Sequence, residues 1–307
     1  MLGYLRHVSG ALMEISSQPL NSSNRLRSIA NFYRWRIGTK LIGSEREVVV
    51  PWVDDSRFAI TRDEHGLAGN IYTGLMDFGD MGFLLHVMRP SGLFVDVGAN
   101  LGAYTILASA VVGAKTIAFE PIPSTVARLI DQVRLNGIER LVTIKNEGVG
   151  SAPGVLSFAL GASNCVTHVA LGGESRIEKA NVTTLDKALA GEVGPIFLKV
   201  DVEGFEYQVI QGGRNILNSA AVQGMIVELN GSGEAFGHPN QQVHDEILAL
   251  GFRPVHYAPL ERRLTPAESF NTSGGNNTIY VKDLDAAQKL CSSASVRTVH
   301  TAAGRKL

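Results

Sequence analysis

From residue 93 onward, the apolar residues of this chain follow two patterns that alternate with each other. Short runs such as 93–97 contain a single polar residue, which is typical of strands buried on both faces. Between these runs, apolar residues recur every three or four positions, as in residues 124–136, and this spacing predicts amphipathic helices. Alternating strands and helices predict an α/β fold in which helices cover both faces of a mostly parallel sheet. The strands are predicted at 93–97, 115–120, 141–146, 196–204, 225–229, 253–258 and 276–282.

The same pattern divides the chain into four segments. Residues 1–47 are polar and basic with weak helical spacing, and are expected to form a partly ordered helical arm. Residues 48–92 contain short strands and one apolar helix, and are expected to form a cap that leads into the sheet. Residues 93–284 form the main domain, and two alternating segments at about 155–171 predict an inserted β-ribbon. Residues 285–307 are small and polar, so a flexible tail is expected there.

The composition is that of an ordinary globular protein, with 45% hydrophobic and 19% charged residues. A formal net charge of -1 gives no field that would recruit nucleic acid. No apolar stretch approaches the ~18 residues of a membrane span, and no signal peptide is recognisable, so a cytoplasmic protein without a transmembrane segment is expected. Cys165 and Cys291 are too few for a disulfide framework or a zinc site, which also favours a reducing compartment.

The turn after the first predicted strand of the main domain has the composition of a ligand-binding loop. Residues 95–102 read VDVGANLG, with Gly98 and Gly102 in a G-x-x-x-G spacing and Asn100 between them. A dinucleotide site prefers G-x-G-x-x-G, so that the pyrophosphate can lie on the helix N-terminus. Asp96, two residues ahead of Gly98, would repel a pyrophosphate. It suits a cationic ligand such as S-adenosylmethionine, which carries a sulfonium and an ammonium.

Acidic residues also follow the other predicted strands. Glu120 ends the second strand, where an acid can accept hydrogen bonds from both ribose hydroxyls of an adenosine. Asp201 and Glu203 follow the apolar run that begins at residue 196, and Glu228 closes the run that begins at 225. Because the carboxyl ends of parallel strands meet at one edge, these side chains are expected to converge there with Asp96. Burying unpaired carboxylates costs several kcal/mol, so core packing does not explain them.

Four segments of this sequence together resemble the FkbM-type family of S-adenosylmethionine-dependent methyltransferases. The segments are FVDVGANLGAYTILAS, AFEPIPSTVARL, LKVDVEGFEYQVIQGG and IVELN, and the resemblance covers residues 93 to about 230. It implies a Rossmann-like class I methyltransferase fold, with a seven-stranded sheet and a reversed last strand. It also implies transfer of a methyl group to a hydroxyl oxygen, on sugars of polysaccharides or glycolipids or on polyketides.

The resemblance assigns roles to individual positions of this chain. It places the methionine part of the donor against residues in and before the turn, namely Asp96, Gly98, Asn100 and Gly102. Glu120 then holds the ribose, and Glu147 lies where the adenine edge is commonly met. Asp201 and Glu203 face the reacting centre and are the candidate catalytic residues.

Methyl transfer to a hydroxyl requires a group that removes the proton of the acceptor. The candidates are Asp201, Glu203, Glu228 and His238, and a carboxylate, either Glu203 or Asp201, is favoured. The three acids could instead offer oxygens to Mg²⁺, but no dedicated ligand spacing indicates a metal, and none is expected.

Three other interpretations of the sequence stay open. The first is an NAD(P)-dependent oxidoreductase on a Rossmann sheet, against which Asp96 and the glycine spacing argue. The second is a module that binds the cofactor without catalysis. The third is an assembly scaffold whose basic N-terminal arm touches a membrane or a carrier lipid. The sequence identifies neither the acceptor, a small molecule or glycan with a free hydroxyl, nor the oligomeric state, and a homo-oligomer is left open.

Overall fold

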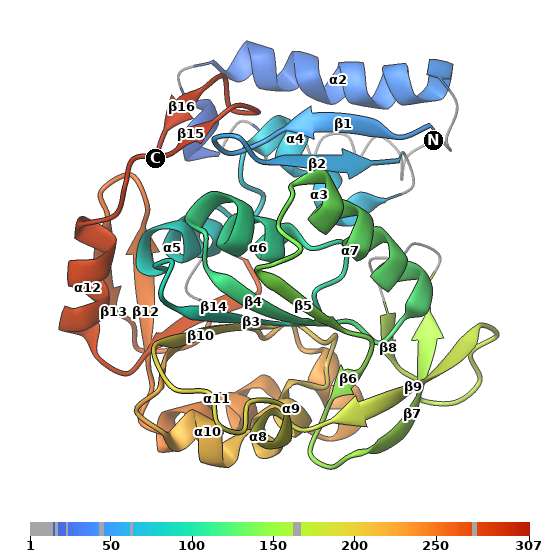
Figure 1. Cartoon of the computed structure of the whole chain (residues 1–307), viewed down its shortest axis with the longest axis vertical. Helices are drawn as coiled ribbons and strands as arrows, with labels where there is room; N and C mark the ends of the chain where they lie inside the picture. Colours follow the sequence, from blue (N-terminus) through green and yellow to red (C-terminus); the bar gives the residue numbers. More distant parts are fainter. Residues whose placement is uncertain are drawn as a thin grey trace.

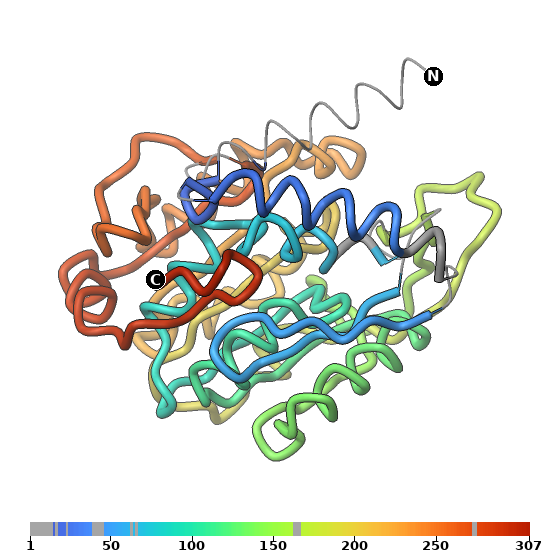
Figure 2. The backbone as a smooth tube through the Cα atoms, turned by 90° about the horizontal axis from the view of Figure 1, so that it is seen from above, coloured from blue at the N-terminus to red at the C-terminus, as the bar shows by residue number. Residues whose placement is uncertain are grey.

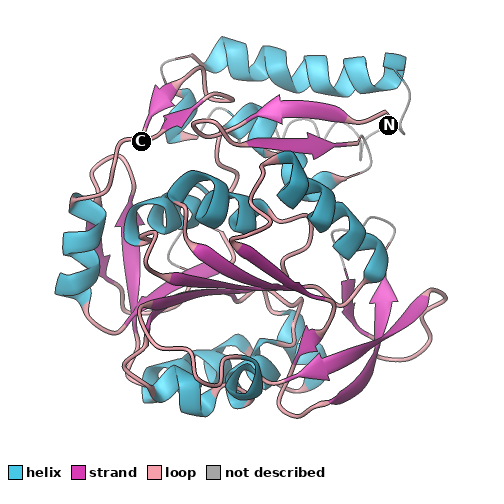
Figure 3. Cartoon of the chain, in the orientation of Figure 1, coloured by secondary structure: helices cyan, strands magenta, loops and turns pink. Residues whose placement is uncertain are grey.

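The computed structural model describes residues 15, 18–22, 24–42, 46–61, 64–161, 167–271 and 275–307. Cys165 and most of the first 17 residues of the predicted arm lie outside this part of the chain. A large sheet crosses the middle of the molecule, and helices cover both of its faces (Figures 1 and 3). The α/β fold with a mostly parallel sheet is therefore as expected.

Five parallel strands form the centre and one edge of this sheet, and three further strands form the other edge. In spatial order the parallel strands are β11 (Val222–Glu228), β10 (Ile196–Val200), β3 (Leu93–Val97), β4 (Lys115–Phe119) and β5 (Val142–Lys145). Next to β11, strand β14 (Asn277–Val281) runs antiparallel to both of its neighbours, and β12 (Arg253–Ala258) follows it. This is the expected reversed strand.

The sheet contains one strand more than the seven expected. Strand β13 (Arg263–Pro266) pairs antiparallel with β12 at the edge of the sheet. Its four residues, RLTP, include one apolar side chain that is buried, Leu264. A strand this short and polar carries no periodic signal, because its place depends on pairing with β12 rather than on its own burial.

The side chains of the central strands alternate between two separate cores. Phe94 of β3 and Phe197 of β10 face one core, and Val95 and Leu198 face the other. Above the first core lie α5 (Phe78–Val87), α6 (Ala103–Ile106) and η2 (Leu107–Val112) (Figure 1). On the same side of the sheet, α7 (Pro123–Leu135) packs Leu129 and Val133 in a smaller cluster with Ala118 of β4. Below the second lie α8 (Leu185–Ala188), α9 (Glu206–Gln211), α10 (Arg214–Asn218) and α11 (Asn240–Ala249) (Figure 1).

The insertion after β5 is larger than the ribbon predicted at about 155–171. It forms a separate four-stranded sheet that extends to Thr183. Its strands are β6 (Gly148–Val149), β9 (Ile177–Thr183), β7 (Gly154–Leu160) and β8 (Thr167–Val169), in that spatial order. Strand β9 carried no clear signal because the apolar residues of IEKANVT follow no regular alternation and only its last two residues are buried.

A layer built from both ends of the chain covers the α5–α7 side of the molecule. Helix α2 (Arg25–Ile42) lies alongside the antiparallel pair β1 (Val48–Pro51) and β2 (Arg57–Ile60) in this layer (Figures 1 and 2). Short helices α3 (His65–Ala68) and α4 (Asn70–Thr73) connect this layer to α5. None of the described helices combines the length and apolar composition needed to cross a bilayer.

The C-terminal segment corrects the expectation of a flexible tail from residue 285. Helix α12 (Leu284–Ser292) packs Ala287 and Cys291 into the core, and β15 (Thr298–Val299) pairs with β16 (Arg305–Lys306). Val299 forms a bridge with Val53. The tail looked polar because its few large apolar residues are widely spaced, yet Val299 and Leu307 are both buried.

Candidate functional site

Strand order changes direction at β3, which has β4 on one side and β10 on the other. In an open α/β sheet, ligands bind at such a switch point, outside the carboxyl ends of the strands. The turn after β3 passes very close to the chain leaving β10. Gly98 has φ +83°, and a Cβ built on it would lie 1.9 Å from the carbonyl oxygen of Asp201. Only glycine fits this crossing.

Glu120 holds the turn after β3 in place. One oxygen of its carboxylate accepts the backbone N–H of Asn100 at 3.1 Å, and the other accepts that of Ile122 at 3.0 Å. Asn100 has φ +49°, and its side-chain oxygen is buried without a protein partner. Burial raises the pKa of Glu120 to about 7, although both backbone contacts favour the ionised form.

Asp96 lies beneath the same turn and is buried. Its carboxylate accepts a hydrogen bond of 2.6 Å from the hydroxyl of Thr105. Burial raises the pKa of Asp96 to about 6. Gly102, the other glycine of this turn, is not among the residues that line the two cavities described below. A Cβ on Gly102 would lie 2.4 Å from Leu129 Cδ1, so this glycine allows α7 to pack closely against the turn.

Two cavities meet at the turn and share Gly98, Asn100 and Asp201 in their walls. The first lies between the turn and the inserted sheet. Its wall includes Glu120, Glu147, Phe158, Val169, Glu203 and Phe205. The second lies between the turn and the segment that leads into α5. Its wall includes Met76, Asp77, Asp96, Leu101, Tyr104 and Lys199. Among the predicted binding residues, the structure thus brings Glu120 and Glu147 to one cavity and Asp96 to the other.

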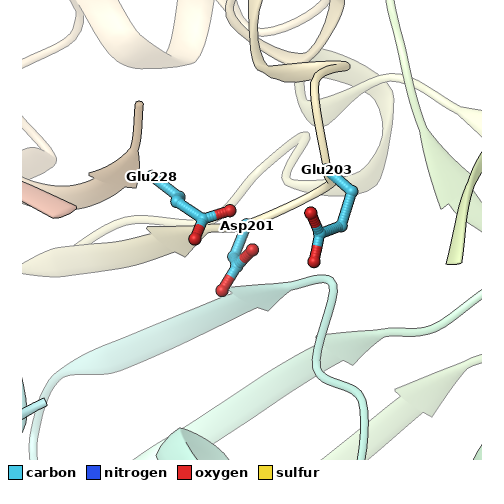
Figure 4. Close-up of side chains that lie close together, drawn as sticks. All are labelled: Asp201, Glu203 and Glu228. Atoms are coloured by element: carbon cyan, nitrogen blue, oxygen red, sulfur yellow. The ribbon is translucent and has the colours of Figure 1, made fainter. Parts of the chain in front are cut away.

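Three carboxylates gather at the ends of β10 and β11. Asp201, Glu203 and Glu228 each place one oxygen within 4.8 Å of the others (Figure 4). Asn230 donates hydrogen bonds to Glu228 at 2.9 Å and to Glu203 at 3.4 Å. The predicted convergence of these acids at one edge of the sheet is therefore present.

The loop that carries Glu203 has an unusual backbone. Glu203 has φ +53° and the next residue, Gly204, has φ +103°. The carboxylate of Glu206 accepts the N–H groups of Val202 and Gly204, both at 3.1 Å, and so fixes this shape. A non-glycine residue in the left-handed region stores strain, which is common at functional sites.

Lys199 is the residue that the sequence analysis missed. It lies in the middle of β10 with 2% of its surface exposed. Its ammonium donates to Asp201 at 3.1 Å and to the side-chain oxygen of Asn277 at 2.9 Å, and it lies 5.4 Å from the centre of the Tyr104 ring. A lysine inside an otherwise apolar run, IFLKV, was the available signal, because a buried lysine needs a charged or polar partner.

Next to Lys199, the three carboxylates have different pKa values. Burial opposes ionisation of Asp201, but the adjacent ammonium outweighs this effect and lowers the pKa of Asp201 below its usual range. Burial and the charge of Asp201 raise the pKa of Glu228 to about 9, so Glu228 keeps its proton at neutral pH. Burial, followed by the charge of Asp201, also raises the pKa of Glu203. The site thus combines an ionised acid with a protonated one.

Further polar side chains lie near Lys199, in addition to Asp201, Glu203 and Glu228. The hydroxyl of Tyr104 donates to Asp77 at 3.1 Å, and Asn277 donates to Asp80 at 3.0 Å. His238, the remaining candidate base, lies elsewhere. Its ring stacks on Tyr207 with centroids 3.8 Å apart, and it lines neither cavity.

Comparison with known proteins gives one family and one curated relative. The profile of the methyltransferase FkbM domain matches residues 96–254. A hexuronic acid methyltransferase, AglP, from Haloferax volcanii is 34% identical over 151 residues, which are 48% of this chain and 59% of that protein. The match thus spans less than two thirds of the relative.

Comparison with solved structures gives matches of low similarity. An rRNA methylase from Streptococcus thermophilus has a TM-score of 0.37 and 13% identity, and the match covers 66% of this chain and 91% of the methylase. A SAM-dependent O-methyltransferase from Thermotoga maritima has a TM-score of 0.35 and 14% identity, with 66% of this chain and 63% of that one covered. Neither similarity indicates what this chain binds.

Proposed function

Because the chain belongs to the FkbM methyltransferase family, we propose that it transfers a methyl group from S-adenosylmethionine to a hydroxyl oxygen of a sugar-like acceptor. The family supports methyl transfer, and the hexuronic acid methyltransferase supports a sugar as the acceptor. The observation that carries the proposal is the meeting of two cavities at Gly98, with acidic side chains in both.

The residues around the turn fit the methyl donor. The methionine part of the donor belongs in the cavity with Asp96, whose carboxylate suits an ammonium. The buried, unpartnered oxygen of Asn100 supports this placement, because an N–H donor there would satisfy it. The ribose belongs at Glu120, and the adenine belongs near Glu147.

The bound donor supplies a methyl group that its positive sulfur has already activated. The protein must then orient the acceptor hydroxyl and accept its proton. We assign the base to Glu203, because its pKa is raised and it lines the cavity. Asp201 is paired with Lys199 and is less basic, so its role is to orient the hydroxyl.

Isothermal titration of the whole chain tests the donor. S-adenosylhomocysteine, the demethylated donor, should bind with measurable heat, and NADH should give none. If only NADH gave heat, the proposal would be wrong, and an oxidoreductase with the same type of sheet would be the better interpretation.

Glu203→Gln tests the assigned base. Turnover on an oligosaccharide that contains hexuronic acid, followed by mass spectrometry of the methylated product, should fall on the order of a hundredfold or more. Affinity for S-adenosylhomocysteine should stay within about twofold, since the amide keeps the size of the side chain. Glu234→Gln, at an exposed position of η3 (Ser232–Phe236), is the matched control. Unchanged turnover in Glu203→Gln would remove Glu203 from the reaction.

A further inference from the structure

Helix α2 is the outermost element on its side of the molecule (Figures 1 and 2). Its inner face is buried, with Ser28 and Phe32 exposing 4% and 2% of their surfaces. The Phe32 ring packs edge-on against Tyr72 with the ring centroids 5.2 Å apart. The inner face therefore holds α2 against the protein. The residues of the outer face are not needed for this packing.

Three large apolar side chains line the outer face of α2. Leu26, Tyr33 and Ile37 expose 83%, 43% and 55% of their surfaces. At 3.6 residues per turn, positions separated by seven and eleven residues lie almost on one line along a helix. The three side chains therefore form a single apolar stripe that faces away from the protein. Exposing such a stripe to water is unfavourable unless a partner covers it.

Basic residues flank this stripe on both sides. On the helix, Arg25 and Arg36 lie to one side of the stripe, and Arg27 and Arg34 lie to the other. With Lys40, α2 contains five basic residues and no acidic one. The rest of the chain then has 23 basic residues, from 28 less 5, against all 29 acidic ones. Positive charge is thus concentrated on α2 although the whole chain is nearly neutral.

One flank of α2 opens into a groove. Arg27, Arg34 and Trp35 of the helix line it on one side, and Val50 of β1 and His300 line it on the other. No carboxylate lines this groove among the described residues. Guanidinium groups beside an indole suit a phosphate at the polar boundary of a lipid layer, where tryptophan and tyrosine are enriched.

We propose that α2 docks the protein on an anionic membrane surface, with Leu26, Tyr33 and Ile37 inserted at the lipid boundary. Arg27 and Arg34 then contact lipid phosphates from the groove. An apolar stripe with basic flanks is the arrangement of helices that lie in the plane of a membrane interface. A second copy of the chain is a poor occupant, because two such faces would bring ten positive charges together. The docking is independent of methyl transfer.

Sedimentation of the whole chain with vesicles tests the docking. Vesicles of phosphatidylcholine with phosphatidylglycerol should bind at least tenfold more protein than vesicles of phosphatidylcholine alone, and added salt should weaken the binding. The pair Leu26→Gln and Ile37→Gln should reduce binding tenfold or more. The pair Arg27→Gln and Arg34→Gln should do the same.

Matched variants at exposed positions outside α2 control for general surface effects. Val193→Gln with Val296→Gln controls for the apolar pair, and Arg134→Gln with Arg140→Gln controls for the basic pair. Both controls should bind vesicles as the unaltered chain does, and thermal unfolding should show that all variants are folded. Equal binding to neutral vesicles, no binding at all, or unchanged binding by the α2 variants would overturn the proposal. Lipid-free self-association that the α2 variants abolish would assign the face to a second copy instead.

Discussion

A single buried lysine organises the charges of the candidate site. Removing an ammonium from water is costly, and Lys199 is stabilised by Asp201, Asn277 and the ring of Tyr104. In return it keeps Asp201 ionised, and the ionised Asp201 favours the protonated form of its neighbour Glu228. The ionisation of these carboxylates therefore depends on Lys199, which also lines the second cavity.

The protonated state of Glu228 predicts a specific pH dependence of stability. Because its pKa in the folded chain is raised to about 9, its contribution is fully present below the pKa of the unfolded chain, about 4.3, and is lost as pH rises towards 9. Glu228→Gln removes this titration. The variant should therefore lose less stability than the unaltered chain between about pH 5 and pH 9, as measured by urea unfolding at several pH values.

A matched variant makes this test specific. Glu234→Gln removes an exposed carboxylate close in sequence and should leave the pH dependence unchanged. Identical slopes for Glu228→Gln and the unaltered chain would mean that Glu228 is ionised in the folded state at neutral pH.

At the scale of elements, the site depends on how closely the turn after β3 approaches the end of β10. Gly98 is required there for two reasons, its positive φ and the carbonyl oxygen of Asp201 beside it. Gly137, after α7, has φ +64° but no atom within 4 Å of a built Cβ. The two glycines thus separate the effect of backbone strain from that of close contact.

Alanine at each glycine should give different results. Gly137→Ala should reduce the free energy of unfolding by about 1–2 kcal/mol, the usual cost of a left-handed alanine. Gly98→Ala should cost more, because β3 and β10 must also move apart, and it should weaken binding of S-adenosylhomocysteine tenfold or more. Urea unfolding and titration calorimetry measure both effects. Equal losses of stability and unchanged binding in Gly98→Ala would contradict the close crossing.

The sequence predicted the central elements well because each carries its own signal. Strands β3, β4 and β10 are apolar on both faces, so their burial is visible in short runs of residues. The acids at their ends converge because parallel strands share a carboxyl edge. Strand β13 escaped prediction because its place depends on pairing with β12 rather than on its own burial. Lys199 escaped because one of its two hydrogen-bond partners, Asn277, is 78 residues away in the sequence. Gly102 shows why a glycine pattern is ambiguous, because a glycine that packs against Leu129 reads the same in the sequence as one that approaches a ligand.

At the scale of the whole molecule, the two ends of the chain stabilise each other. Arg297 forms an ion pair of 3.1 Å with Asp54, and Arg305 donates to the hydroxyl of Ser22 at 2.8 Å. Thr301 and Trp52 both donate to the carbonyl of Gly74. The segment after α12 therefore holds the layer that contains α2, β1 and β2 in place through these contacts.

The contacts between the two ends of the chain also determine when this layer can be completed during synthesis. Asp54 and its partner Arg297 are separated by 243 residues. At about 5–20 residues per second, a ribosome needs on the order of ten to fifty seconds to travel between them. For that time the nascent β1–β2 hairpin lacks the segment that pairs with it at Val53. The N-terminal layer is thus synthesised first but completed only when the C-terminal segment has left the ribosome.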